Sequence, residues 1–457
     1  MPLPQRRNST DRKSVKEKIN PWDVARLLVP LFIAAFLFRQ ALQDGLDLRV
    51  YWAAAREFVS DGELYAPGLP GTPHGGMAFT YPPFAAAVLS PMAFLPVQAA
   101  LVIQTISNLV IAAIIGTVVT RYLVDRSVVR TPGGPAQLLM ASLFITGLFL
   151  LLGPWRNSME LGQINPLLMA LILLDLLGAT RRHPNGFVPR GVLTGIAAGL
   201  KLTPLVFLLY FVVRGDFKSA ARMAATFAAT VALMVLLAPS LSAQYWLAAL
   251  RDTNRVGTLA RFENISLRGF FARLDLEPGT ASLLWIVASL AVTVMGAIVI
   301  YRMRRLEDQW VPVSAAALVM LLVSPVSWSH HWVWVAAVVP ALIGRYVQTT
   351  PQPYRWLRFL RSWPGALSLV LVASFALQPP EAAMLSGSPA PYASISTFSE
   401  FVVEFGIFGG VLVLAWYATL TADPRTTAAA AVPDRRPTAG MSAERGVRFT
   451  GRSRDSG

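Results

Sequence analysis

The sequence predicts an all-α protein, a polytopic bundle of about twelve transmembrane helices with a large first extracytoplasmic loop. Composition is the first reason: 54% of the 457 residues are hydrophobic and 14% are charged, whereas about 25% are charged in a soluble domain. Second, apolar runs able to cross roughly 30 Å of hydrocarbon recur through most of the chain. Third, Lys and Arg, which give a net charge of +15, concentrate between these runs and in both tails, as the positive-inside rule predicts.

The apolar runs define a membrane domain at residues 22–420 between two polar tails. We place the spans near 24–42, 83–97, 99–120, 136–153, 166–180, 191–213, 219–238, 281–301, 311–327, 332–348, 363–378 and 400–420. The tails at 1–21 and 421–457 lack apolar periodicity, and we expect both to be disordered and cytoplasmic. Several runs are shorter than the usual ~20 residues, so tilted, kinked or re-entrant segments are expected.

The basic N-terminal tail sets the orientation. With that tail inside a cell membrane, residues 43–82, residues 239–280 and the segment around His330 lie on the extracytoplasmic side. Most of the polar residues that could take part in catalysis or substrate binding fall in these outer segments. We therefore expect an extracytoplasmic active site.

Two basic loops, at 121–130 and 181–190, conflict with this orientation if there are twelve spans. An alternative makes 83–97 and 191–213 re-entrant, so that each enters and leaves by one face. This removes both conflicts and mainly changes the side on which 154–165 lies. We prefer twelve spans and keep the re-entrant arrangement as the alternative.

What the sequence lacks excludes several classes of function. It contains no cysteine, which excludes disulfides, thiolate metal sites and a cysteine nucleophile. It has no dinucleotide or P-loop fingerprint, zinc spacing, nucleophile elbow or nucleic-acid-binding module. No acidic cluster accompanies its candidate catalytic carboxylate, so we predict no metal, no cofactor and no nucleic-acid partner.

Asp47 is the candidate carboxylate, in the first outer loop. It opens a short amphipathic helix, with Tyr51 one turn later on the same face, and Tyr81 follows in a Phe-Thr-Tyr-Pro-Pro run. An Asp at such a position is often only a helix cap. A carboxylate at a membrane surface among Tyr and Trp is also a plausible general base for a sugar hydroxyl. From these residues alone, both readings stay open.

Two adjacent histidines lie in a second polar run, Ser324–Trp334. Neighbouring positions on a helix point about 100° apart, so His330 and His331 are poor joint metal ligands. We expect one to face a cavity as a hydrogen-bonding or proton-carrying group, with Trp328 beside it. The alternative is that both belong to an interfacial aromatic belt.

Three further segments offer polar contacts. Lys201 stands inside an apolar run, which costs roughly 2.5–3.5 kcal/mol unless it is paired or snorkels, and a lipid phosphate is one natural partner. Gln163 and Asn165 either bind sugar hydroxyls or cap the helix that starts at Pro166. The candidates in the outer loop are Asn264 and Arg268, of which Arg268 either holds a phosphate or is simply solvated.

Five motifs in this order resemble those of the GT-C membrane glycosyltransferases. The motifs are Asp47-Leu-Arg-Val-Tyr51, Phe79-Thr-Tyr-Pro-Pro83, Gly162-Gln-Ile-Asn165, Lys201-Leu-Thr-Pro204 and Ser324-Pro-Val-Ser-Trp-Ser-His-His331. The nearest resemblance is to the polyprenol-phosphate-mannose-dependent α-mannosyltransferases of actinobacterial mannophospholipid and lipoglycan synthesis. Where that family usually has Asn-Gln-Ser in an outer loop, this chain has Asn264-Ile-Ser266, which leaves the acceptor and linkage open.

The resemblance implies a reaction and roles. An acceptor hydroxyl on a mannolipid or lipoglycan attacks the anomeric carbon of polyprenyl-phosphate-mannose, Asp47 takes the proton, and the lipid phosphate leaves. Lys201, Arg268 and a protonated His331 stabilise the developing charge. A β-linked donor would give an α-mannoside, α-(1→2) by the resemblance.

Two alternatives remain. A transferase of the same fold could use another polyprenyl-phosphate sugar, such as arabinose. A transporter of lipids or solutes is the more distant possibility, because the sequence shows no repeated halves and Asp47 lies at the edge of a span.

Overall fold

The computed structural model describes residues 21–42, 45–73, 76–129, 134–177, 188–252, 255, 257–306, 308–349, 355–377 and 397–420. The predicted tails at 1–21 and 421–457 lie outside these residues, apart from Pro21. Regular structure in the described part is helical, and β pairing there is limited to the isolated bridges Leu69–Met77 and Asn264–Trp328. The all-α prediction is confirmed for these residues.

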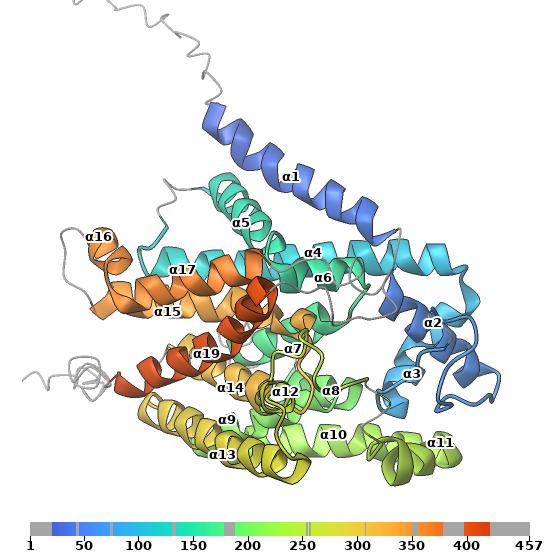
Figure 1. The fold of residues 1–457 in the computed structure, drawn as a ribbon. Helices are drawn as coiled ribbons and strands as arrows, with labels where there is room; N and C mark the ends of the chain where they lie inside the picture. Colours follow the sequence, from blue (N-terminus) through green and yellow to red (C-terminus); the bar gives the residue numbers. More distant parts are fainter. Residues whose placement is uncertain are drawn as a thin grey trace, which may run out of the picture. The chain divides into compact units, whose positions relative to one another are not determined.

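The N-terminal half of the chain contributes the first twelve helical elements described. They are α1 (Pro21–Ala41), α2 (Leu46–Val59), α3 (Pro83–Leu89), η1 (Ser90–Phe94), α4 (Val97–Asp125), α5 (Pro135–Leu150), α6 (Gly153–Glu160), α7 (Asn165–Leu177), α8 (Val192–Leu200), η3 (Thr203–Val206), α9 (Phe207–Val213) and α10 (Phe217–Leu237). Helix α5 packs against both α1 and α4 (Figure 1).

The C-terminal half continues the bundle. Its elements are α11 (Pro239–Ala243), η4 (Gln244–Ala249), α12 (Leu267–Arg273), α13 (Pro278–Arg302), α14 (Trp310–Val323), η6 (Ser329–Trp334), α15 (Val335–Thr349), α16 (Arg355–Leu360), α17 (Trp363–Ala376) and α19 (Thr397–Thr419). Almost every residue of α14 is buried, so protein surrounds it on all sides, and it packs on α13 and α15 (Figure 1). The Ser324–His331 motif begins where this central helix ends.

Among the described helices, three are long and apolar enough to cross a membrane: α4, α10 and α13. The number rises to five if each of two bent pairs, α1 with α2 and α5 with α6, forms one span. Six shorter apolar helices accompany them. A helical membrane protein is therefore the architecture that the structure supports, and the count of twelve spans stays a prediction.

Two of the expected spans differ from a long continuous helix. Residues 83–97 contain α3 and η1, which together form one short apolar helix, Pro83–Phe94. Residues 191–213 form α8, η3 and α9, with the backbone extended at Lys201 (φ −152°, ψ 132°) before Pro204. A continuous helix is therefore wrong for 191–213, which has the break that the re-entrant alternative requires.

Residues 154–165, expected to be a loop, are mostly helical. Helix α6 lies at 84° to α5 and begins with Pro154 in its first turn, where a missing N–H costs nothing. The buried Trp155 anchors α6, because its indole donates to the Val333 carbonyl (2.9 Å). This crossing helix delivers Gln163 and Asn165 to the site.

Candidate active site

A cavity of about 610 Å³ contains most of the residues predicted from the sequence. Each of the five motifs contributes at least one residue to the lining of this cavity. The predicted residues that line it are Asp47, Tyr51, Tyr81, Gln163, Lys201, Trp328, His330 and His331. Ligand-binding cavities commonly measure roughly 300–1,000 Å³, so this cavity is the candidate active site.

The first turn of α2 is attached to the end of α6. The backbone N–H groups of Asp47 and Leu48 both donate to the Leu161 carbonyl (3.1 Å each). Gly162 has φ +69°, and a Cβ there would lie 2.8 Å from the Cβ of Leu48. Only glycine accepts both that conformation and that contact, so Gly162 allows the approach that sets Asp47 beside Gln163.

Asp47 is not the cap of its helix. Gly45 occupies the N-cap position of α2, and Asp47 lies in the first turn. Its Oδ2 accepts a hydrogen bond from Nε2 of Gln163. The capping alternative is wrong, and the carboxylate instead faces the cavity.

Gln163 is the centre of a hydrogen-bond network. While its Nε2 donates to Asp47, its Oε1 accepts from the Tyr51 hydroxyl (3.0 Å) and from Nδ2 of Asn165 (3.1 Å). The Tyr51 and Tyr81 hydroxyls are also 3.0 Å apart. Because every polar atom of the Gln163 amide is engaged, the amide cannot flip without breaking bonds, which fixes the carboxylate of Asp47.

Lys201 stands at the break between α8 and η3. Its Nζ bonds to Oδ1 of Asn165 (3.0 Å), to Nε2 of His331 (2.8 Å) and, at 3.5 Å, to the Tyr81 hydroxyl. It also lies 5.2 Å from the centroid of the Tyr81 ring. In the described part of the chain these hydrogen-bond partners are all neutral, so none of them competes with an anionic ligand for Lys201.

His331 accepts the hydrogen bond from Lys201 and is itself neutral. Burial holds the pKa of His331 well below its usual value, and the neighbouring Lys201 and His330 lower it further. The lowered pKa of His331 disfavours the protonated form that was expected from the sequence. Both histidines line the cavity, with ring planes at 85°, so neither only packs. The His330 carbonyl accepts from Asn165 (3.2 Å).

Several buried amides that hold the network were not predicted. Nδ2 of Asn108 and Nε2 of Gln104, on α4, donate to the Gln163 carbonyl (3.0 and 3.3 Å). Asn157 on α6 donates to the Ser329 hydroxyl (2.7 Å). The signal for Gln104 and Asn108 was their placement four residues apart inside an apolar run, because polar groups at membrane depth seldom lack a partner.

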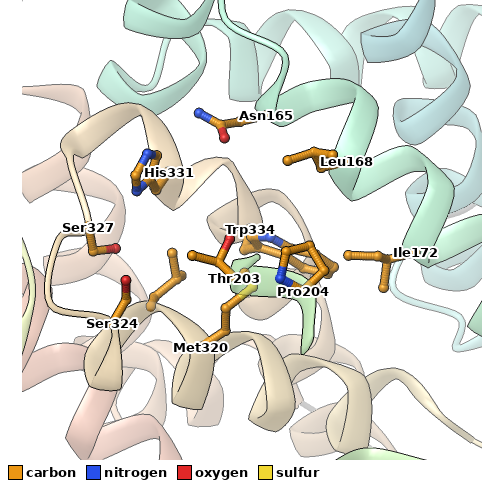
Figure 2. A pocket seen from close by; sticks show the side chains of 11 residues that line it. Asn165, Leu168, Ile172, Thr203, Pro204, Met320, Ser324, Ser327, His331 and Trp334 are labelled. Atoms are coloured by element: carbon orange, nitrogen blue, oxygen red, sulfur yellow. The ribbon is translucent and has the colours of Figure 1, made fainter. Parts of the chain in front are cut away.

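A second, smaller pocket lies behind His331 and Asn165, with a volume of about 20 Å³. Figure 2 shows these two polar side chains at one side of it and the apolar Pro204 and Ile172 at the other. A pocket of this size holds about one water molecule. It is therefore too small for substrate, and the larger cavity is where a sugar can bind.

Residues 79–325 match the sequence profile of glycosyltransferase family 87. The chain belongs to this family. A relative from Mycolicibacterium smegmatis is 37% identical over 309 residues, 64% of this chain and 68% of its own length, and is named a polyprenol-phosphate-mannose-dependent α-(1-2)-phosphatidylinositol mannoside mannosyltransferase. A protein of the same name from Mycobacterium tuberculosis is 37% identical over 307 residues, 65% of this chain and 70% of that one.

A third relative, also from Mycobacterium tuberculosis, is named a phosphatidylinositol pentamannoside mannosyltransferase of the same donor dependence. It is 33% identical over 314 residues, 67% of this chain and 68% of its own. No solved structure matches the chain. The resemblance inferred from five motifs is confirmed, and the protein is a family 87 glycosyltransferase. Asp47 precedes the matched segment, and its bond to Gln163 connects it to the family's region.

Three predicted substrate contacts do not line the larger cavity of this family 87 site: Asn165, which lines only the smaller pocket, Asn264 and Arg268. Asn264 is fully buried and does not line the cavity. Its amide donates to the carbonyls of Leu259 (3.0 Å) and Pro325 (3.2 Å) and accepts from the Ser327 N–H (2.9 Å). It therefore joins two segments of the wall and does not contact a ligand.

Arg268 lies away from the cavity. Its guanidinium donates to the Ser282 hydroxyl (2.8 Å) and stands 5.1 Å from the Trp285 ring centroid. The serine and tryptophan are on α13, so Arg268 fixes α12 to α13. The arginines between η4 and α12 that do line the cavity are Arg255 and Arg261, which the motif comparison did not single out.

Proposed function

We propose that this protein transfers a mannosyl residue from polyprenyl-phosphate-mannose to a phosphatidylinositol mannoside, or to a related mannolipid or lipoglycan, through an α-(1→2) linkage. The observation that carries the proposal is the placement of Asp47 and Lys201 on one cavity wall, joined through the amides of Gln163 and Asn165. The names of the mycobacterial relatives supply the donor, the acceptor and the linkage.

Two neutral amides separate the two charges. Gln163 contacts the Asp47 carboxylate and Asn165 contacts the Lys201 ammonium. A carboxylate in this position can accept a proton, and an ammonium can bind an anion. A transferase with a phosphate leaving group needs both.

The reaction follows from these positions. The acceptor hydroxyl attacks the anomeric carbon of the donor while Asp47 takes its proton. The bond between the anomeric carbon and the phosphate oxygen breaks, and Lys201, held by Asn165 and His331, stabilises the negative charge on the departing lipid phosphate. A phosphate leaves readily without a proton donor, which agrees with a neutral His331 that positions Lys201. Direct displacement inverts the configuration at the anomeric carbon of the donor, so a β-linked donor yields an α-mannoside.

The experiment that tests this function uses the purified protein in nanodiscs with radiolabelled polyprenyl-phosphate-mannose and a phosphatidylinositol mannoside. Wild type should form a longer mannolipid. Asp47→Asn, which keeps the hydrogen-bonding shape, should lower kcat about 10²–10⁴-fold, as expected for loss of a general base. Matched thermal unfolding of the two proteins is the control.

Each other result has a definite meaning. If wild type transfers no mannose, the proposed donor is wrong and a polyprenyl-phosphate arabinose should be tried in the same assay. If Asp47→Asn retains full activity, transfer does not depend on that carboxylate and the mechanism above is wrong.

The proposed topology has twelve spans in a cell membrane, of which 83–97 is short and 191–213 is broken, with both termini in the cytoplasm and the cavity outside. The support is the distribution of Lys and Arg along the sequence. Because the chain has no cysteine, single cysteines report sidedness directly. In intact cells an impermeant maleimide should label Ser60→Cys, at the exposed end of α2, and should label Lys218→Cys, exposed on α10, only after lysis. The reverse labelling pattern would show that the protein has the opposite orientation in the membrane.

A further inference from the structure

A second group of charged side chains lines the same cavity. It comes from the segment between η4 and α12 and consists of Asp252, Arg255, Arg261 and Glu263. Arg261 makes a bidentate ion pair with Glu263, with Nη2–Oε1 and Nε–Oε2 distances of 2.6 and 3.2 Å. The Arg261 guanidinium lies 5.7 Å from the ring centroid of Trp328, which also lines the cavity.

This arrangement is held in place by its surroundings. Glu263 is only 5% exposed, and a carboxylate so buried requires the partner that Arg261 provides. Next to it, the Ile265 N–H donates to the Ser327 carbonyl (2.8 Å), and Asn264 pairs with Trp328 in a β-bridge. The ion pair and the indole are therefore fixed relative to each other, as a preorganised binding surface requires.

The charges here differ in availability from that of Lys201. The Arg261 guanidinium is already neutralised by Glu263. The two terminal nitrogens of Arg255 donate to the carbonyls of Tyr65 (2.8 Å), Ala66 (3.1 Å) and Phe79 (3.3 Å). The part of this wall formed by Arg261 and Glu263 therefore suits a neutral ligand, whereas the Lys201 wall suits an anion.

Hydroxyl groups are the ligand chemistry that such a wall recognises. A carboxylate accepts hydrogen bonds from hydroxyls and a guanidinium donates to them, while an indole offers apolar area to the C–H face of a ring. We propose that Arg261, Glu263 and Trp328 form the subsite that binds a neutral sugar ring of the acceptor. This inference rests on the proposed function and adds which wall holds the acceptor and by which of its groups.

The test compares Glu263→Gln with Arg268→Met in the nanodisc assay. Arg268 is the matched control, because it also lies over a tryptophan ring but does not line the cavity. Glu263→Gln should raise KM for the acceptor about tenfold, since hydrogen bonds to charged groups are strong. It should leave KM for the donor within about twofold, and Arg268→Met should leave both unchanged.

A structural role for Glu263 predicts a different pattern. If the ion pair only holds the loop, Glu263→Gln will lower thermal stability and raise both KM values together, and the proposal is then wrong. The KM values can be compared only if wild type transfers mannose. A wild type that transfers no mannose would therefore contradict the proposed function and not this inference. Donor and acceptor KM values thus separate the two failures.

Octyl α-mannoside, which has no phosphate, separates recognition of sugar from recognition of phosphate. It should compete with the lipid acceptor, and its inhibition constant should also rise about tenfold in Glu263→Gln. If it competes equally well in both proteins, or does not compete in wild type, then this wall does not bind the sugar and the proposal is overturned.

Discussion

The cavity has two charged walls, and the cation at each wall has a different kind of partner. At the first, Lys201 bonds only to neutral groups in the described residues, namely Asn165, Tyr81 and His331. At the second, Arg261 is paired with the buried Glu263. A cation in a cavity is therefore not by itself an anion site. Its partners decide whether its charge can act on a ligand.

The physical reason for the difference lies in the backbone. Lys201 sits where α8 ends and the chain is extended before Pro204, so its side chain leaves a helix end toward amide and imidazole groups from other segments. Arg261 and Glu263 are two residues apart on one short segment, where each is the nearest partner of the other. The local ion pair neutralises the cation at the second wall, whereas the hydrogen-bond partners of Lys201 at the first wall are neutral.

The largest effect that sharpens this comparison comes from exchanging each cation for methionine. Lys201→Met should raise KM for the polyprenyl-phosphate donor about 10–100-fold, because it removes a hydrogen-bonding charge from a buried phosphate contact. Arg261→Met should leave donor KM within about twofold and weaken only acceptor binding. Steady-state kinetics with each substrate varied in turn measures both.

Lys201→Arg is the control for charge against shape. It keeps the positive charge but presents a planar fork to a contact made by a compact ammonium, so donor KM should fall between those of wild type and Lys201→Met. Equal donor KM values in Lys201→Met and Arg261→Met would mean that the two walls do not divide the substrates.

Sequence reasoning located the first wall well and the second poorly. Asp47 and Tyr51 were predictable as one face of a short helix, and Pro204 signalled the break at Lys201, because both features depend on local spacing. The partner that removes Asp47 from a capping role, Gln163, is 116 residues away. Pairings of this kind are set by tertiary packing, which a local pattern does not contain.

The segment between η4 and α12 shows the same limit of local patterns. Asn264 and Arg268 were the contacts predicted from this part of the chain, yet one joins backbone segments and the other fixes α12 to α13. Arg261 and Glu263 stand two residues apart, and nothing in that spacing says that the pair is buried. The role of a loop residue depends on what its side chain contacts, so the roles of these residues could be assigned only from the three-dimensional structure.

The smallest expected effect is that of the Arg268→Met substitution on the thermal stability of the protein. The change removes one hydrogen bond to Ser282 and the contact with Trp285, which together contribute on the order of 1–2 kcal/mol. The thermal midpoint should fall by a few degrees at most, while kcat/KM for both substrates stays within about twofold. Thermal unfolding and steady-state assays on one preparation check this. A large loss of donor use with unchanged stability would return Arg268 to the phosphate site, and would show that α12 moves toward the cavity when substrate binds.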